Sequence, residues 1–110
     1  MKNAYKRGDI ILIKFPFSNM MDFKVRPALL ICDQKDEDIT LLPISTSINL
    51  NRQDIPIKRN HYLGDPLPVA SVVRLTKITT VHSELVIKKI SEVKQDFSKE
   101  VQLALFRCLS

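Results

Sequence analysis

A guanidinium group and a cluster of hydroxyl groups stand at the ends of two apolar segments near the middle of the chain. Arg26 opens the first segment, Val25–Cys32, and Ser45 and Thr46 follow the second, Ile39–Ile44. An arginine side chain can bind two phosphate oxygens at once, and a small hydroxyl can hydrogen-bond the same oxygens. If folding brings these groups together, they suit the binding of a phosphodiester and the stabilisation of charge that develops on it.

The two apolar segments must position these groups. Each is of strand length and rich in aliphatic and β-branched residues, and the charged residues 33–38 connect them. This pattern predicts a buried β-hairpin. In an antiparallel pair with its tip at 33–38, Arg26 and the hydroxyls after Ile44 lie at the same end. We therefore predict the active site at this open end of the hairpin.

Composition indicates one globular domain over residues 1–110, with 45% hydrophobic and 26% charged residues and enough length for a core. No apolar run approaches the roughly 20 residues of a membrane-spanning helix. The residues before Asp9 lack the apolar segment of a signal peptide. We expect a cytoplasmic protein without membrane contacts. The net charge of +5, from 17 basic and 12 acidic residues, is compatible with nucleic acid as a partner.

The rest of the chain predicts a mainly β fold with a C-terminal helix. Further strands are expected at residues 10–15, 54–57, 69–75 and 85–90. Pro56 marks its strand as an edge strand, because one side of such a strand is unpaired. An amphipathic helix is predicted at 98–109, with Ser98 as its N-cap. Many short strands followed by one helix indicate an antiparallel barrel closed by that helix.

The loop predicted at residues 16–24 carries apolar side chains, including Phe17. One interpretation is a lid folded onto the barrel. The other is a mobile flap whose aromatic and thioether surface packs against bases or a partner peptide.

The two cysteines, Cys32 and Cys108, are predicted to be buried free thiols, because no secretion signal favours a disulfide. They form no CxxC motif, and His61 and His82 have no ligand partner at a useful spacing. No metal site is therefore expected.

Four segments, taken in order, resemble the MazF/PemK family of toxin endoribonucleases, the toxin halves of bacterial type II toxin–antitoxin pairs. They are GDIILIKFPF (8–17), KVRPALLI (24–31), LLPISTS (41–47) and ASVVRLTKI (70–78). The resemblance implies an SH3-like antiparallel barrel, a homodimer, and cleavage of single-stranded RNA such as mRNA at short sequences, without metal or another cofactor. It also implies a cognate antitoxin, a peptide or protein that covers the RNA groove.

Carried over by position, the resemblance makes Arg26 the catalytic arginine and Ser45 the catalytic hydroxyl, with Thr46 as a rival. The candidate RNA-binding residues are Phe17, Lys24, Arg52, Arg74 and Lys77. The sequence departs from the family pattern in two places: the 16–24 loop lacks a glycine-rich, acidic character, and Thr79 stands where many members carry an arginine.

Metal-free RNA cleavage requires the 2′-OH to attack the adjacent phosphorus, which yields a 2′,3′-cyclic phosphate and a 5′-OH. Arg26 suits the stabilisation of charge on the phosphoryl oxygens, and Ser45 or Thr46 suits the fixing of the phosphate. The proton transfers need a base and an acid. His61 and His82 are candidates by residue type only, and a surface or structural role is the favoured interpretation for both.

Each assignment has a structural alternative. Arg26 would otherwise form a surface ion pair with Asp22 or Asp9, and Ser45 would satisfy a backbone group at a strand end. At the level of the whole protein, the alternatives are a non-catalytic SH3-like module that binds RNA or a peptide, and a gyrase-inhibiting toxin of the same fold.

Overall fold

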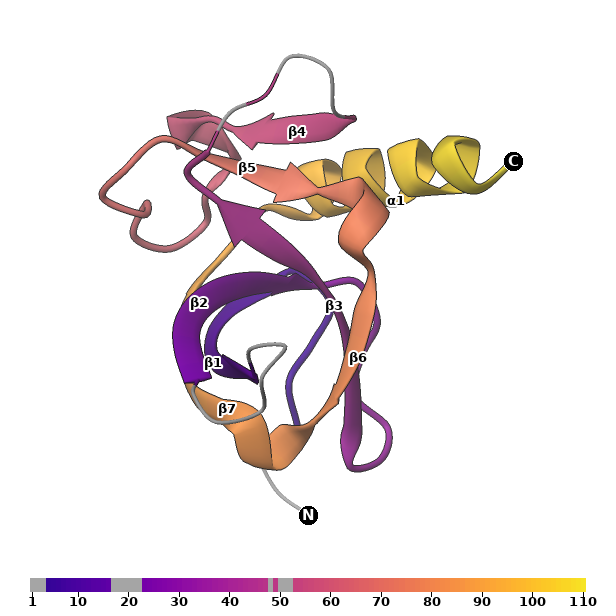
Figure 1. Ribbon diagram of the computed structural model, residues 1–110. Helices are drawn as coiled ribbons and strands as arrows, with labels where there is room; N and C mark the ends of the chain where they lie inside the picture. The colour runs from indigo at the N-terminus through magenta and orange to yellow at the C-terminus, as the bar shows by residue number, and fades with distance from the viewer. Residues whose placement is uncertain (1–3, 17–22, 48, 50–52) are drawn as a thin grey trace.

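The computed structural model describes residues 4–16, 23–47, 49 and 53–110 (Figure 1). The strands are β1 (Asp9–Pro16), β2 (Phe23–Leu30), β3 (Asp38–Ser45), β4 (Asp54–Ile57), β5 (Ser71–Arg74), β6 (Thr79–His82) and β7 (Val86–Glu92). Short 3₁₀ turns, η1 (Arg59–His61), η2 (Leu75–Lys77) and η3 (Ser83–Leu85), lie between them, and helix α1 (Gln95–Leu109) follows. All strand pairs are antiparallel, so the predicted mainly β fold with a C-terminal helix is confirmed.

The central hairpin is formed by β2 and β3, as predicted, with Ala28 opposite Pro43 and Leu30 opposite Leu41. Successive side chains of a strand point to opposite faces, and in this hairpin both faces are covered. One face belongs to a barrel core with Ile11, Ile13, Ala28, Leu30, Ile39, Leu41 and Val81. The other belongs to a core under α1 that includes Leu29, Leu42, Ile44, Val73, Phe97, Val101 and Leu105. Burial on both sides explains why the two segments read as near-continuous apolar runs.

Strand β3 connects the two halves of the molecule (Figure 1). Its residues 38–41 pair with β6, residues 41–43 pair with β2, and its last two residues, Ile44 and Ser45, pair with β5. The strand order is β4-β5-β3-β2-β1-β7, with β6 also on β3 and with β4 at an edge as predicted. The β2–β3 ladder ends at Ala28 and Pro43, where Pro43 and the neighbouring Pro27 lack the N–H that a ladder needs. Beyond these prolines the two strands separate.

The helix begins earlier than predicted, and the predicted N-cap was wrong. Lys94 is the N-cap residue, and Ser98 is buried inside the helix with its N–H donated to the Lys94 carbonyl. The reason is Phe97, which is 1% exposed, because burying this ring requires the first helical turn to lie against the core. Within the described residues, no helix is long and apolar enough to cross a bilayer.

Two other expectations differ from the structure. The strand predicted at 69–75 is shortened to β5, because Val69 and Ala70 are exposed and Leu75 opens η2. Cys32 is exposed just after β2, and Cys108 is half-buried, so burial of both thiols was wrong while their free state was correct. In the 16–24 loop, Phe17 and its neighbours through residue 22 lie outside the described residues.

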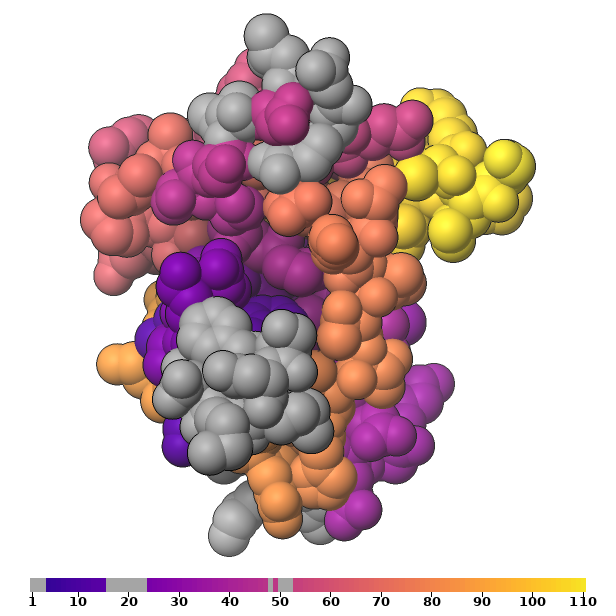
Figure 2. Space-filling model, in the orientation of Figure 1, coloured from indigo at the N-terminus to yellow at the C-terminus, as the bar shows by residue number. Residues whose placement is uncertain are grey.

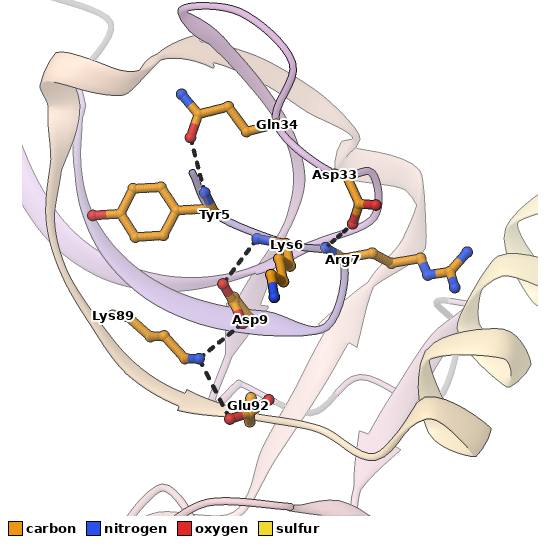
Figure 3. A network of polar contacts seen from close by, with 8 residues as sticks. All are labelled: Tyr5, Lys6, Arg7, Asp9, Asp33, Gln34, Lys89 and Glu92. Atoms are coloured by element: carbon orange, nitrogen blue, oxygen red, sulfur yellow. Dashed lines mark hydrogen bonds and ion pairs between the residues drawn. The ribbon is translucent and has the colours of Figure 1, made fainter. Parts of the chain in front are cut away.

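A polar network fixes the chain before β1 (Figure 3). Asp9 is buried, accepts the Lys6 N–H at 2.9 Å and forms an ion pair with Lys89 at 3.1 Å. Lys89 also contacts Glu92 at 3.4 Å. Partial burial acts to lower the pKa of Lys89, but the contacts with Asp9 and Glu92 outweigh it and raise that pKa. Backbone N–H groups add two further ties, from Tyr5 to Gln34 and from Arg7 to Asp33.

Candidate active site

Arg26 and Ser45 line the same pocket, at the end of the hairpin where β2 and β3 separate. The pocket has a volume of about 320 Å³ and is lined by Phe15, Arg26, Pro43, Ile44, Ser45, Arg74, Lys77 and Thr79. Figure 2 shows the hollow between the purple surface of β2 and the orange surface of η2 and β6. The volume lies at the lower end of the range for ligand sites. The two groups predicted to meet are therefore brought together.

Arg26 faces the pocket because of its register in the barrel. It lies opposite Ile13 of β1 and two residues before buried Ala28, so alternation places its side chain on the inward face at the open end. The side chain is half-buried and forms no ion pair or hydrogen bond with any described residue. The predicted alternative partner Asp9 pairs with Lys89 instead, and Asp22 lies outside the described residues. The guanidinium is available to an anion.

Ser45 is the last residue of β3 and shares a face with Leu41 and Pro43 by alternation. Its Oγ accepts the Ser47 N–H at 3.0 Å, which is the backbone role anticipated from the sequence. This bond leaves the hydroxyl proton for another acceptor. Thr46 is exposed and is not among the lining residues. The geometry therefore favours Ser45 over Thr46.

Two more cations complete the pocket wall. Arg74, the last residue of β5, and Lys77, the last residue of η2, both predicted to bind RNA, line it. The described lining residues thus carry three basic groups and no carboxylate or imidazole, an arrangement that attracts a phosphate. Lys24 is exposed on β2 but does not line the pocket, and Arg52 and Phe17 lie outside the described residues.

The pocket also contains residues that the sequence reasoning did not assign to it. Phe15 follows buried Ile11 and Ile13 at alternate positions of β1. This alternation in the sequence could have predicted that Phe15 lies on the same face as those two residues. Thr79 had been noted only as a departure from the family pattern. It donates its Oγ1–H to the Lys77 carbonyl at 2.8 Å and so stabilises the turn that presents Lys77.

The histidines have structural roles. The His61 ring stacks on Phe97, with centroids 4.2 Å apart, and its Nδ1 accepts the Lys58 N–H at 2.9 Å. The His82 Nδ1 accepts the Glu84 N–H at 3.0 Å. Neither histidine lines the pocket. Within the part of the chain that the structure describes, no three His, Cys, Asp or Glu side chains are grouped to hold a metal ion.

Nearly the whole chain matches the model of one protein family. Residues 6–109 match the model of the PemK-like, MazF-like toxins of type II toxin–antitoxin systems. The chain is a member of this toxin family. A search of curated proteins found no match.

Solved structures share the fold at low sequence identity. MazF from Deinococcus radiodurans superposes with a TM-score of 0.76 at 16% identity over 98% of each chain. A mycobacterial endoribonuclease in complex with its cognate antitoxin gives 0.73 at 15% identity, covering 97% of this chain and 94% of that one. The Mycobacterium tuberculosis toxin MazF-mt6 gives 0.71 at 17%, covering 92% and 95%. The MazF-like fold is thereby established.

Proposed function

We propose that this toxin is an endoribonuclease that cuts single-stranded RNA, including mRNA, at short sequences. The observation that carries the proposal is the convergence of Arg26 and Ser45 on one pocket with two further cations, Arg74 and Lys77. A structural neighbour is named an endoribonuclease, which supports the same activity here.

In the proposed reaction, the 2′-oxygen attacks the adjacent phosphorus and loses its proton as the bond to phosphorus forms. The P–O5′ bond breaks, and the leaving oxygen takes a proton. The products are a 2′,3′-cyclic phosphate and a 5′-OH, so atoms and charge balance without water. Arg26 binds two phosphoryl oxygens through its planar fork, and the Ser45 hydroxyl donates to one of them. These contacts strengthen as negative charge grows on the oxygens.

The remaining cations bind the rest of the substrate. Arg74 and Lys77 hold phosphate oxygens next to the scissile group, and the half-buried Phe15 ring offers a surface for a base. Because none of the described lining residues is a carboxylate or imidazole, the protein's main contribution is charge stabilisation and orientation.

That same lack of a base favours one competing function, a module that binds RNA without cutting it. The deciding experiment incubates the purified protein with a long single-stranded RNA in EDTA and sequences any 5′-OH ends. Discrete cuts that carry cyclic phosphate, and that are lost in Arg26→Ala, support the endoribonuclease. Binding without cuts supports the module, and inhibition of gyrase would instead indicate a gyrase poison.

The toxin also has a surface suited to a second copy. On α1, Leu103, Phe106 and Leu109 follow one another at intervals of three residues and are 57%, 72% and 69% exposed. Exposed apolar side chains grouped on one helix face are typical of protein–protein contact sites, and we propose that this ridge is covered in a homodimer. Light scattering should show a dimer for the wild type and a monomer for Phe106→Glu. A wild-type monomer at micromolar concentration would contradict this.

The cognate antitoxin is proposed to be an acidic peptide segment that occupies the basic pocket and excludes RNA. A neighbour crystallised with its own antitoxin and the positive lining of the pocket support this assignment. An acidic peptide from the antitoxin should compete with RNA, and Arg26→Ala should weaken both.

A further inference from the structure

Behind the pocket wall, a carboxylate lies against one of its cations. Asp54 of β4 and Arg74 of β5 are directly opposite one another in the strand register. The Asp54 Oδ1 lies 3.9 Å from the Arg74 Nε, which is too long for a hydrogen bond but within ion-pair range. The two side chains are 7% and 22% exposed, so water screens their attraction less than at an open surface.

The contact leaves the functional end of the arginine available. A guanidinium has five N–H donors, and the ion-pair contact with Asp54 is made at Nε. The terminal Nη groups, which make bidentate contacts with phosphate, are therefore not used by this contact. Because opposed residues in an antiparallel pair project to the same face, the edge strand β4 places its carboxylate where it restrains Arg74 without entering the pocket lining.

We propose that Asp54 is a positioning residue that holds the Arg74 guanidinium toward the bound RNA phosphate. The identity of the ligand rests on the proposed function, whereas the restraint on Arg74 does not. Asp54 contributes through Arg74 and does not itself touch the RNA.

Charge alone predicts the opposite outcome, which makes the proposal testable. Asp54→Asn removes one negative charge and so makes the net charge of the molecule more positive by one. Long-range attraction alone would therefore tighten RNA binding. Loss of positioning would instead weaken it. Asp38→Asn is the matched control, because Asp38 is an exposed aspartate at the far end of β3 and its substitution changes the net charge equally.

The experiment measures binding of a non-cleavable, 2′-deoxy-substituted oligonucleotide together with cleavage of the normal RNA. Asp54→Asn should weaken binding about tenfold, as for the loss of one charge-assisted contact, whereas Asp38→Asn should bind as well as the wild type or better. In an Arg74→Ala background, Asp54→Asn should have no further effect on RNA binding, because the proposed role is the positioning of that arginine. Tight binding by folded Asp54→Asn, or an undiminished effect without Arg74, would overturn the proposal.

A spectroscopic readout separates this proposal from the proposed function. The Arg74 Nε–Hε resonance should shift and broaden in Asp54→Asn and stay in place in Asp38→Asn. If the wild type neither binds nor cuts RNA, the endoribonuclease assignment fails, and an unchanged Arg74 resonance would still overturn the positioning role. If Asp54→Asn does not fold, Asp54→Glu keeps the charge but moves the carboxylate by one methylene, and it should give a smaller loss of binding.

Discussion

The two ends of the barrel use the same kinds of cations in opposite ways. At the end near the N-terminus, Lys89 lies between the carboxylates of Asp9 and Glu92 (Figure 3). At the other end, Arg26 and Lys77 line a pocket whose described walls hold no carboxylate. A paired cation stabilises the fold, while an unpaired and partly shielded cation attracts an anion. Arg74 of the binding end does have a carboxylate partner, Asp54, but this carboxylate is not among the residues that line the pocket. The difference shows that the position of the carboxylates, rather than the number of basic residues, distinguishes the binding end.

Removing one cation at each end, by Arg26→Ala and by Lys89→Ala, should give the largest difference between the two ends. Arg26→Ala should lower the cleavage rate about 100- to 1,000-fold, the usual range for losing a group that stabilises transition-state charge, with little change in unfolding free energy. Single-turnover cleavage and urea unfolding measure the two effects. Lys89→Ala is the control and should leave the rate within about twofold while lowering stability. A large rate loss in Lys89→Ala would contradict the division of roles.

The hydroxyl at the binding end gives the next largest effect. Ser45→Ala should slow cleavage about tenfold or more, because the phosphate loses a hydrogen-bond donor in the transition state. Thr46→Ala is the matched control, since Thr46 is exposed outside the pocket, and it should stay within about twofold. The reverse ranking of the two variants would assign the role to Thr46.

At the structural end, Asp9→Asn should destabilise the fold by about 2 kcal/mol, the cost expected when one partner of a shielded, hydrogen-bonded charge pair is removed. Asp9 accepts the Lys6 N–H and pairs with Lys89, so both ties weaken. Urea unfolding at neutral pH measures the loss. RNA cleavage under conditions where the variant is folded should be unchanged, and a change would link this network to the pocket.

The pH dependence offers a smaller test of the same contrast. The pKa of Lys89 is raised in the folded protein, so the folded state binds this proton more tightly than the unfolded chain. The stabilisation is complete below the unfolded pKa of about 10.5 and disappears as the pH rises through the raised value. Urea unfolding between pH 8 and 11 should show a steeper alkaline loss for the wild type than for Lys89→Gln. Equal slopes would contradict the assignment.

No histidine is among the described residues that line the pocket. Because His61 and His82 act as backbone acceptors away from the pocket, neither imidazole should contribute to the cleavage rate. His82→Gln should cut RNA at the wild-type rate. A large rate loss in this folded variant would identify a base that the geometry does not.

The sequence was sufficient to predict the hairpin and the meeting of Arg26 with Ser45. Both follow from local rules, because strand-length apolar runs and an antiparallel tip determine which ends meet. The choice between Ser45 and Thr46 depends on which face of β3 lines the pocket. That face carries Pro43 and Leu41, and the sequence alone does not show that Leu41 belongs to the barrel core.

The features that the sequence did not predict depend on distant contacts. The helix start depends on burial of Phe97, which overrides the local preference of Ser98 for an N-cap. The end of β5 depends on Leu75 turning into the core under α1. The pairing of Asp54 with Arg74 depends on the register of two short strands that a long connection separates.

The account is tested most directly by a crystal structure of the toxin with an RNA oligonucleotide that carries a single 2′-deoxy substitution at the cleavage site. We predict that the phosphate following this sugar lies in the pocket, with its oxygens about 3 Å from the Arg26 guanidinium and the Ser45 Oγ. An RNA bound on another face, with Arg26 making no contact to phosphate, would contradict the account.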